Sequence, residues 1–201
     1  MLVIVLWMLG FALVHSVTAD KRVKAYIADK FGERFRHGWY RLFYNVLSVI
    51  SLAPLFLYMA INSPVLYTVP DNLKLFFQIL QFLGLLGVAI SILQIDWMRF
   101  AGLRQVIAYL SGDELPLQDE PLKIDGLYGF VRHPLYLFSL MFFWFSPILT
   151  NTGLMFNLLA TAYFVFGSII EERRMLDYYG ETYENYRRQV PWLIPFMPTK
   201  A

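Results

Sequence analysis

Two short polar motifs lie at the ends of apolar runs and carry residue types that can do chemistry. The first is Arg132-His133-Pro134, where a polar segment becomes apolar, and the second is Glu171-Glu172, which closes a later apolar run. A helix that begins at Pro134 presents unpaired N–H groups, a cation and an imidazole to an incoming carboxylate. The two glutamates can hold ribose hydroxyls or a cation. The motifs are therefore complementary halves of a site for a zwitterionic ligand.

Each motif also has a simpler structural interpretation. Arg132 can reach lipid phosphates while His133 caps a helix, and Glu171 can form an exposed ion pair with Arg174 three residues later. The functional interpretation is favoured if the motifs lie together, because acidic residues at a membrane boundary are costly unless they are paired or functional. The short connection "TNTG" between the last two apolar runs predicts a helical hairpin, which brings the glutamates to the start of the preceding helix.

The composition places these motifs in a membrane protein. Of 201 residues, 58% are hydrophobic and only 16% are charged, whereas soluble domains carry about 25% charged residues. The sequence predicts an all-α, polytopic membrane domain over residues 1–201, with a three-helix part over 1–98 and a cofactor-binding part over 99–201. We expect about five membrane-spanning helices, since five apolar runs approach the length required: Leu2–Ala19, Trp39–Ile61, Leu73–Trp97, Pro134–Leu149 and Gly153–Ile170.

The first apolar run resembles a signal peptide, but basic residues follow it rather than precede it, so we expect a retained helix. Of the 17 Lys and Arg residues, all but Lys74 lie in the first loop, the third loop and the tail, which includes Lys200. With five spans these three segments share one side of the membrane. The positive-inside rule then predicts an outside N-terminus, a cytoplasmic C-terminus and a site that faces the cytoplasm.

The tail contains a stripe of large side chains at helical spacing. Leu176, Tyr179, Tyr183, Tyr186 and Val190 recur every three or four residues, with Gly180 between the second and third. Such a stripe either packs against the protein or the membrane surface, or covers the site.

Two polar residues, His15 and Asn45, lie within the first two apolar runs. Intramembrane polar residues are candidates for function, although interhelical hydrogen bonds explain both equally well. The chain has no Cys, which excludes disulfides and Cys-ligated metals. No metal-binding or nucleic-acid-binding pattern is present, so we expect neither partner.

The quoted residues carry a family resemblance. "GLYGFVRHPLY", an apolar hairpin and "EERRMLDYYGETYENYRRQVPWLIP" resemble the C-terminal half of the isoprenylcysteine carboxyl methyltransferase and phospholipid methyltransferase superfamily. These are integral membrane enzymes that use S-adenosylmethionine without a Rossmann domain. The similarity covers Gly126 to Pro195. It implies cofactor contacts at Leu122, Lys123, Tyr128, His133, Pro134, Leu135, Tyr136 and Glu171.

The N-terminal half resembles a particular branch of this superfamily. "HS" in the first run, "YRLFYN" and "FAGLRQ" are similar to the methanethiol S-methyltransferase branch and to neighbouring denitrification-associated membrane proteins. This resemblance implies a small or hydrophobic thiol as substrate, with Arg104 and Gln105 near the site and with His15 and Asn45 as further candidates. In the isoprenylcysteine enzymes an Arg that engages the substrate lies one turn before the Glu matching Glu171. Gly167 occupies that position here, which disfavours a prenylated cysteine.

The sequence thus predicts an S-adenosylmethionine-dependent methyltransferase that acts on a thiol from the bilayer or the cytosol. Arg132 and His133 would hold the cofactor's carboxylate and Glu171 its other end. Glu172 or His133 would accept the thiol proton, and Arg104 would stabilise the thiolate. Three alternatives stay open: methylation of a phospholipid amine, methylation of a prenylcysteine carboxylate, and a non-enzymatic membrane scaffold.

Overall fold

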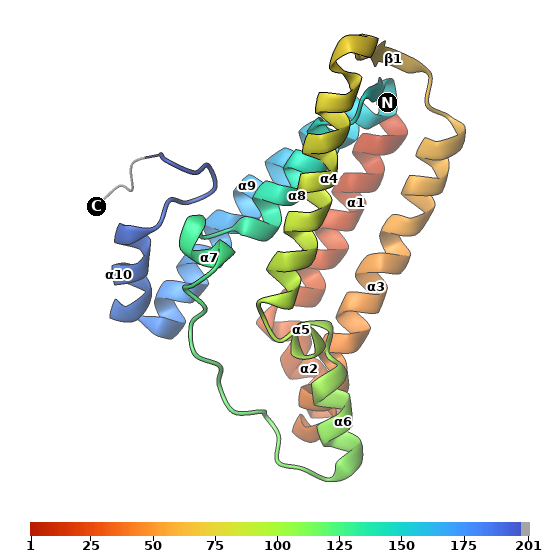
Figure 1. Ribbon diagram of the computed structural model, residues 1–201. Helices are drawn as coiled ribbons and strands as arrows, with labels where there is room; N and C mark the ends of the chain where they lie inside the picture. The colour runs from red at the N-terminus through yellow and green to blue at the C-terminus, as the bar shows by residue number, and fades with distance from the viewer. Residues whose placement is uncertain (198–201) are drawn as a thin grey trace. The chain divides into compact units, whose positions relative to one another are not determined.

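The computed structural model describes residues 1–197 and is mostly helical (Figure 1). Lys200, counted above among the basic residues of the tail, lies outside the described residues. The chain forms two compact units, each built from two separate stretches of sequence. The first unit comprises Met1–Ser63 and Asp96–Glu120, and the second comprises Pro64–Ile95 and the chain from Pro121 onward. The division at residue 98 that we expected from the sequence stays a prediction.

The first unit is a set of helices in which α1 and α3 are the long members. α1 has the bounds of the first predicted span, and α3 includes the second. Asp20 ends α1 and also caps the following helix, because its Oδ1 accepts a hydrogen bond of 2.7 Å from the Arg22 backbone N–H. The helices are α1 (Leu2–Ala19), α2 (Lys21–Phe31), α3 (Glu33–Ile61), α5 (Trp97–Ala101) and α6 (Leu103–Ser111).

The second unit contains the predicted helical hairpin. Its helices are α4 (Asp71–Leu93), α7 (Leu127–Phe130), α8 (Pro134–Trp144), α9 (Asn151–Tyr179) and α10 (Glu181–Gln189). Two short antiparallel strands, β1 (Val65–Thr68) and β2 (Ile148–Thr150), connect the α8–α9 turn to the segment that precedes α4. Thr150 caps α9, because its Oγ1 accepts a hydrogen bond of 3.0 Å from the Gly153 backbone N–H.

α4 and α8 pack closely along their length (Figure 1), and small residues of α4 make this approach possible. A Cβ atom on Gly84 would lie 2.6 Å from the Phe142 backbone nitrogen, and one on Gly87 would overlap the Phe138 ring. Small residues at such interfaces let membrane helices approach closely and gain van der Waals contact. This packing fixes α8, and hence the residues at its N-terminal end, against α4.

Within residues 1–197, four helices are long and apolar enough to cross a membrane: α1, α3, α4 and α9. The chain is therefore a multi-pass membrane protein. The fourth predicted span instead forms α8, whose 11 residues extend about 16 Å, short of a bilayer core of about 30 Å. α8 ends before Pro147, which has no N–H to continue a helix. The predicted count of five spans is not confirmed, and the orientation of the termini stays a prediction.

α9 continues beyond Ile170, where we expected its span to end, as far as Tyr179. Glu171 and Glu172 therefore lie inside a helix rather than at its end. Gly180, with a φ of +55°, ends α9 and begins α10, a backbone conformation that side-chain-bearing residues rarely adopt. All five residues of the stripe in the tail pack into one apolar cluster, together with Leu122 and Met175. Within it Tyr183, Tyr186 and Val190 are buried, and the other members are partly buried.

Candidate functional site

A largely buried ion pair joins the start of α8 to α9. The Nε atom of Arg132 donates a hydrogen bond of 2.6 Å to Glu172 Oε1, and these side chains are only 7% and 15% exposed. The Nη1 atom of Arg132 donates to the backbone carbonyls of Arg187 and Val190, at 2.9 and 2.7 Å. Arg187 lies in the last turn of α10 and Val190 is its C-cap residue, so no intrahelical donor remains for these carbonyls. Arg132 therefore links α9 to the end of α10.

The backbone around Arg132 strengthens this link. Its N–H donates to the Pro191 carbonyl at 2.9 Å, and the N–H of His133 donates to the Trp192 carbonyl at 3.3 Å. The segment after α10 is thus bound to the two residues that precede Pro134. Through these bonds the tail is attached directly to the Arg-His-Pro motif.

His133 lies between the two glutamates. Its Nε2 atom is 3.4 Å from Glu172 Oε1, and its Nδ1 atom is 3.7 Å from Glu171 Oε2. The imidazole is stacked on the Tyr136 ring, with 5.4 Å between centroids and 2° between planes. Tyr136 is stacked in turn on Phe164 of α9, at 4.9 Å and 6°. The hairpin has brought the two predicted motifs together, and an aromatic stack holds them in place.

The neighbouring glutamates differ in their surroundings. Glu171 accepts a hydrogen bond of 2.9 Å from the Tyr136 hydroxyl, yet its side chain remains 41% exposed. Glu172 is committed to Arg132 and His133. Glu171 is therefore the carboxylate that an incoming ligand can reach.

Arg132, His133, Glu171 and Glu172 form a polar cluster. Three tyrosines around this polar cluster remain protonated at neutral pH. Burial, with a smaller contribution from the Glu171 charge, raises the pKa of Tyr128 to about 12. Burial also raises the pKa of Tyr183 and of Tyr186 above the ordinary value for a phenol. Their hydroxyl groups act as neutral donors, and that of Tyr186 donates to the Tyr128 carbonyl at 2.6 Å.

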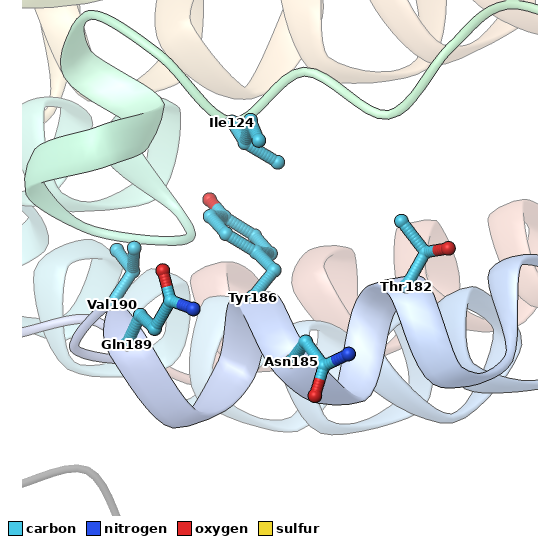
Figure 2. A pocket seen from close by; sticks show the side chains of 6 residues that line it. All are labelled: Ile124, Thr182, Asn185, Tyr186, Gln189 and Val190. Carbon is cyan, nitrogen blue, oxygen red and sulfur yellow. The ribbon is translucent and has the colours of Figure 1, made fainter.

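A pocket of about 300 Å³ adjoins the cluster (Figure 2). The Tyr186 ring points from α10 toward Ile124 on the loop before α7, as Figure 2 shows. The remaining lining residues come from α10 and its end: Thr182, Asn185, Gln189 and Val190. Val190 is shared with the cluster, because its carbonyl accepts the hydrogen bond from Arg132. The pocket combines an aromatic face, an aliphatic face and two amide side chains.

Several of these residues were not predicted from the sequence. Asn185 and Gln189 lie four residues apart on α10, a spacing that puts both amides on one face of the helix. The aromatic stripe on the same helix was the stronger pattern, and it predicts packing rather than a ligand site. Phe164 had no distinguishing neighbours in the sequence. Gln94 was also missed, and its Oε1 accepts a hydrogen bond of 2.9 Å from the Leu127 N–H, which positions α7.

The other residues predicted in this part of the chain lie around the same cluster. Leu122 packs against the buried tyrosines of α10, and Lys123 forms an ion pair of 2.8 Å with Asp125. Tyr128 donates to the Ser91 carbonyl at 3.4 Å. Pro134 is buried at the first position of α8, and Leu135 follows it.

Four predicted residues lie in the first unit, where each has partners of its own. His15 is within hydrogen-bonding distance of Ser48 and Tyr44, and Asn45 donates to the carbonyls of Phe100 and Ala101. That these residues contribute to the same functional site as the polar cluster of the second unit stays a prediction.

The remaining two of these residues lie on α6. Arg104 pairs with Asp96, and this hydrogen bond holds the pKa of the Asp96 carboxyl below its usual value. Gln105 is buried and donates to the Arg99 carbonyl at 3.1 Å, while its Oε1 has no partner among the described residues.

These observations define a class: a multi-pass helical membrane protein with a polar, partly open site where a helical hairpin meets an amphipathic tail. The family described as "Protein of unknown function (DUF1295)" matches residues 1–190, and the chain belongs to it. No solved structure matches the chain.

Several relatives that align over most of the chain are named methanethiol S-methyltransferases. The chain is 37% identical over 196 residues to a methanethiol S-methyltransferase of Crocosphaera subtropica. The aligned region covers 95% of this chain and 73% of the relative. It is 33% identical over 189 residues to methanethiol S-methyltransferase 1 of Bradyrhizobium diazoefficiens, covering 92% of this chain and 64% of the relative. A stretch of 84 residues, 40% of this chain and 36% of the relative, is 34% identical to the protein-S-isoprenylcysteine O-methyltransferase of Schizosaccharomyces pombe. The predicted resemblance is confirmed.

Proposed function

We propose that this chain is an S-adenosylmethionine-dependent methyltransferase that methylates a small or hydrophobic thiol at the site of the second unit. The observation that carries the proposal is Glu171, a reachable carboxylate held by Tyr136 beside the start of α8. The thiol is chosen because relatives aligned over most of the chain are named methanethiol S-methyltransferases.

The residues present fit such a cofactor. In the first turn of α8 the backbone N–H groups of Leu135 and Tyr136 have no acceptor within the helix and favour an anionic group such as a carboxylate. Glu171 can accept hydrogen bonds from the ribose hydroxyls. The amides of Asn185 and Gln189 match the donor and acceptor edge of an adenine, as such amides do elsewhere. The volume of about 300 Å³ lies at the lower end of ligand pockets, which suits the adenine rather than the whole cofactor.

The protein's own residues then orient the ligands and handle the proton. When bound, S-adenosylmethionine supplies an electrophilic methyl group. Arg132 and Glu172 hold α8, α9 and the tail in one arrangement, which is positioning rather than direct contact. Of the two predicted proton acceptors, we favour His133, because the Glu172 carboxylate is already occupied by its ion pair with Arg132. The role of Arg104 in stabilising a thiolate is a separate prediction, because Arg104 belongs to the first unit and the proposed site to the second.

Binding of S-adenosylhomocysteine to the purified protein in detergent, measured by calorimetry, tests the proposal. We expect binding in the parent protein and at least about tenfold weaker binding in Glu171→Gln, because hydrogen bonds to a charged group contribute about 1.5–3 kcal/mol. Glu181→Gln, at an exposed carboxylate on α10, is the matched control and should bind like the parent. Unchanged affinity in Glu171→Gln would remove the role assigned to Glu171. Absence of binding to a folded parent would favour the non-enzymatic scaffold.

The acceptor requires a separate assay. The parent protein is incubated with the cofactor and either methanethiol, longer alkyl thiols or phosphatidylethanolamine, and methylated products are measured. We expect turnover of thiols and none of the lipid amine. Methylation of the lipid alone would keep the methyltransferase assignment and overturn the choice of acceptor.

A further inference from the structure

The short helix α2 is held at the membrane boundary by its neighbours. One residue, Asp20, separates it from α1, and one residue, Gly32, separates it from α3. Both neighbours are long and apolar enough to span a bilayer. α2 also packs against α1 and α3 within the first unit. It therefore cannot move away from the lipid headgroups that surround the ends of these two helices.

One face of α2 is basic, aromatic and exposed. Arg22, Tyr26 and Lys30 follow one another at intervals of four residues, so they form a single stripe. All three are exposed, and Tyr26 retains 60% of its accessible surface. The Lys30 ammonium lies 5.9 Å from the centre of the Tyr26 ring. Val23 and Ile27, which lie beside this stripe on the helix, are half-buried.

Within residues 1–197, no ion pair neutralises the cations of this stripe. Among the residues that the structure describes, none of the ion pairs involves Lys21, Arg22 or Lys30. α10 is a useful contrast, because its Arg187 and Arg188 both pair with Glu184, at 2.8 and 3.4 Å. The basic charge of α2 is thus available to an external anion.

We propose that α2 is an interfacial helix whose Arg22–Tyr26–Lys30 stripe binds the surface of anionic phospholipids. Basic side chains next to a membrane-spanning helix are attracted to negative lipid headgroups, and amphipathic helices with aromatic and basic residues lie in the interface plane. The tyrosine ring suits the boundary between headgroup and acyl chain. This inference does not depend on the proposed methyl transfer.

The absence of cysteine from the chain permits a clean test. An Ala25→Cys variant, at an exposed position of α2, is labelled with an environment-sensitive fluorophore. It is placed in nanodiscs of phosphatidylcholine alone, or of equal amounts of phosphatidylcholine and phosphatidylglycerol. Quenching by acrylamide, which is uncharged, reports how far the label is exposed to water.

We expect quenching to fall about twofold in the anionic discs, and the difference to disappear in high salt, which screens charges beyond about 3 Å at 1 M. Arg22→Gln/Lys30→Gln should abolish the difference. Arg22→Lys/Lys30→Arg, which preserves both charges, should retain it. Arg187→Gln/Arg188→Gln, which removes the same number of charges from α10, should retain it as well.

Three results would overturn the proposal. Equal quenching in both kinds of disc would show that α2 does not sense anionic lipid. A difference that survives in Arg22→Gln/Lys30→Gln, in protein whose thermal unfolding is unchanged, would exclude the stripe. Loss of the difference on adding inorganic phosphate at constant ionic strength would indicate a site for free anions instead of a lipid surface.

Discussion

Two clusters of polar side chains, one in each unit, both contain a histidine and a tyrosine hydroxyl but differ in what they leave available. In the first unit, His15 of α1 is within hydrogen-bonding distance of Ser48 and Tyr44 of α3, and Ser48 donates in turn to the Tyr44 carbonyl. Both ring nitrogens of His15 are occupied by these contacts. In the second unit, Arg132, His133 and Glu172 form a similar network, but Glu171 beside them remains 41% exposed.

The comparison indicates how to separate a structural cluster from a functional one in a membrane protein. Sequence position made both clusters candidates, since polar residues near or within a span are costly. A network whose groups are all satisfied between two helices stabilises the helix pair. A network that holds one carboxylate in place and leaves it accessible next to a pocket can bind a ligand. The predictions below test this distinction, beginning with the largest expected effect.

Removing the cation at the centre of the second cluster should be the most damaging change. Arg132→Ala leaves the largely buried Glu172 carboxylate with His133 at 3.4 Å but without its guanidinium partner, and it releases the carbonyls at the end of α10. We expect a loss of about 3–5 kcal/mol, the usual cost of breaking a buried pair, measured by thermal or denaturant unfolding in detergent. Arg188→Ala breaks an exposed pair with Glu184 and should cost about 1 kcal/mol or less. Equal losses would contradict the assigned role of Arg132.

The adjacent glutamates should separate stability from binding. Glu172→Gln leaves Arg132 without its charged partner and should lower the free energy of unfolding by about 3 kcal/mol. Glu171→Gln keeps an acceptor for the Tyr136 hydroxyl and should cost about 1 kcal/mol, while weakening binding of S-adenosylhomocysteine. Unfolding and calorimetry on both variants provide the check. The distinction fails if Glu171→Gln is the less stable of the two.

Helix glycines of the second unit should respond in opposite directions. Gly87→Ala forces a methyl group into the Phe138 ring, and overpacking of this kind costs about 1–3 kcal/mol. A Cβ on Gly167 meets nothing within 4 Å, so Gly167→Ala should stabilise α9 by up to about 1 kcal/mol. Thermal unfolding measures both changes. Destabilisation by Gly167→Ala would mean that the space beside it is filled in the folded protein.

The first cluster should affect stability only. His15→Ala removes hydrogen bonds between α1 and α3, which in membrane proteins contribute about 0.6–2 kcal/mol. We expect unchanged affinity for S-adenosylhomocysteine, measured on protein that is still folded. A folded His15→Ala protein with much weaker binding would place His15 in the functional site and break the comparison.

The smallest effect at neutral pH concerns the buried phenol of Tyr128. Its pKa is raised from 10.0 to about 12, so the folded state favours the neutral form. This contribution to stability is fully present below pH 10 and is lost as the pH rises from 10 toward 12. Unfolding at increasing alkaline pH should therefore show a weaker decline in Tyr128→Phe than in the parent. An identical decline in both proteins would contradict the raised pKa.

Much of the site could be predicted because its signals are local. Pro134 fits only the first turn of a helix, and the four residues between two apolar runs permit little except a hairpin. These features direct Glu171 and Glu172 toward the Arg-His-Pro motif, and the extended segment that contains β2 completes the connection between α8 and α9. The bounds of α1 were equally predictable, since a continuous apolar run followed by a capping Asp20 defines both ends.

The tertiary structure decided which group does what. Successive residues on a helix point about 100° apart, so the orientation of α9 against α8 determines that the Glu172 side chain is only 15% exposed and that of Glu171 is 41% exposed. The partners of Arg132 depend on where α10 ends, and this follows from the packing of Tyr183, Tyr186 and Val190 rather than from any short motif. Residue types and local spacing thus determined the elements and the meeting of the two motifs. The division of roles within the site required contacts between segments about 40 to 60 residues apart in the chain, whose free energy depends on the whole packed arrangement.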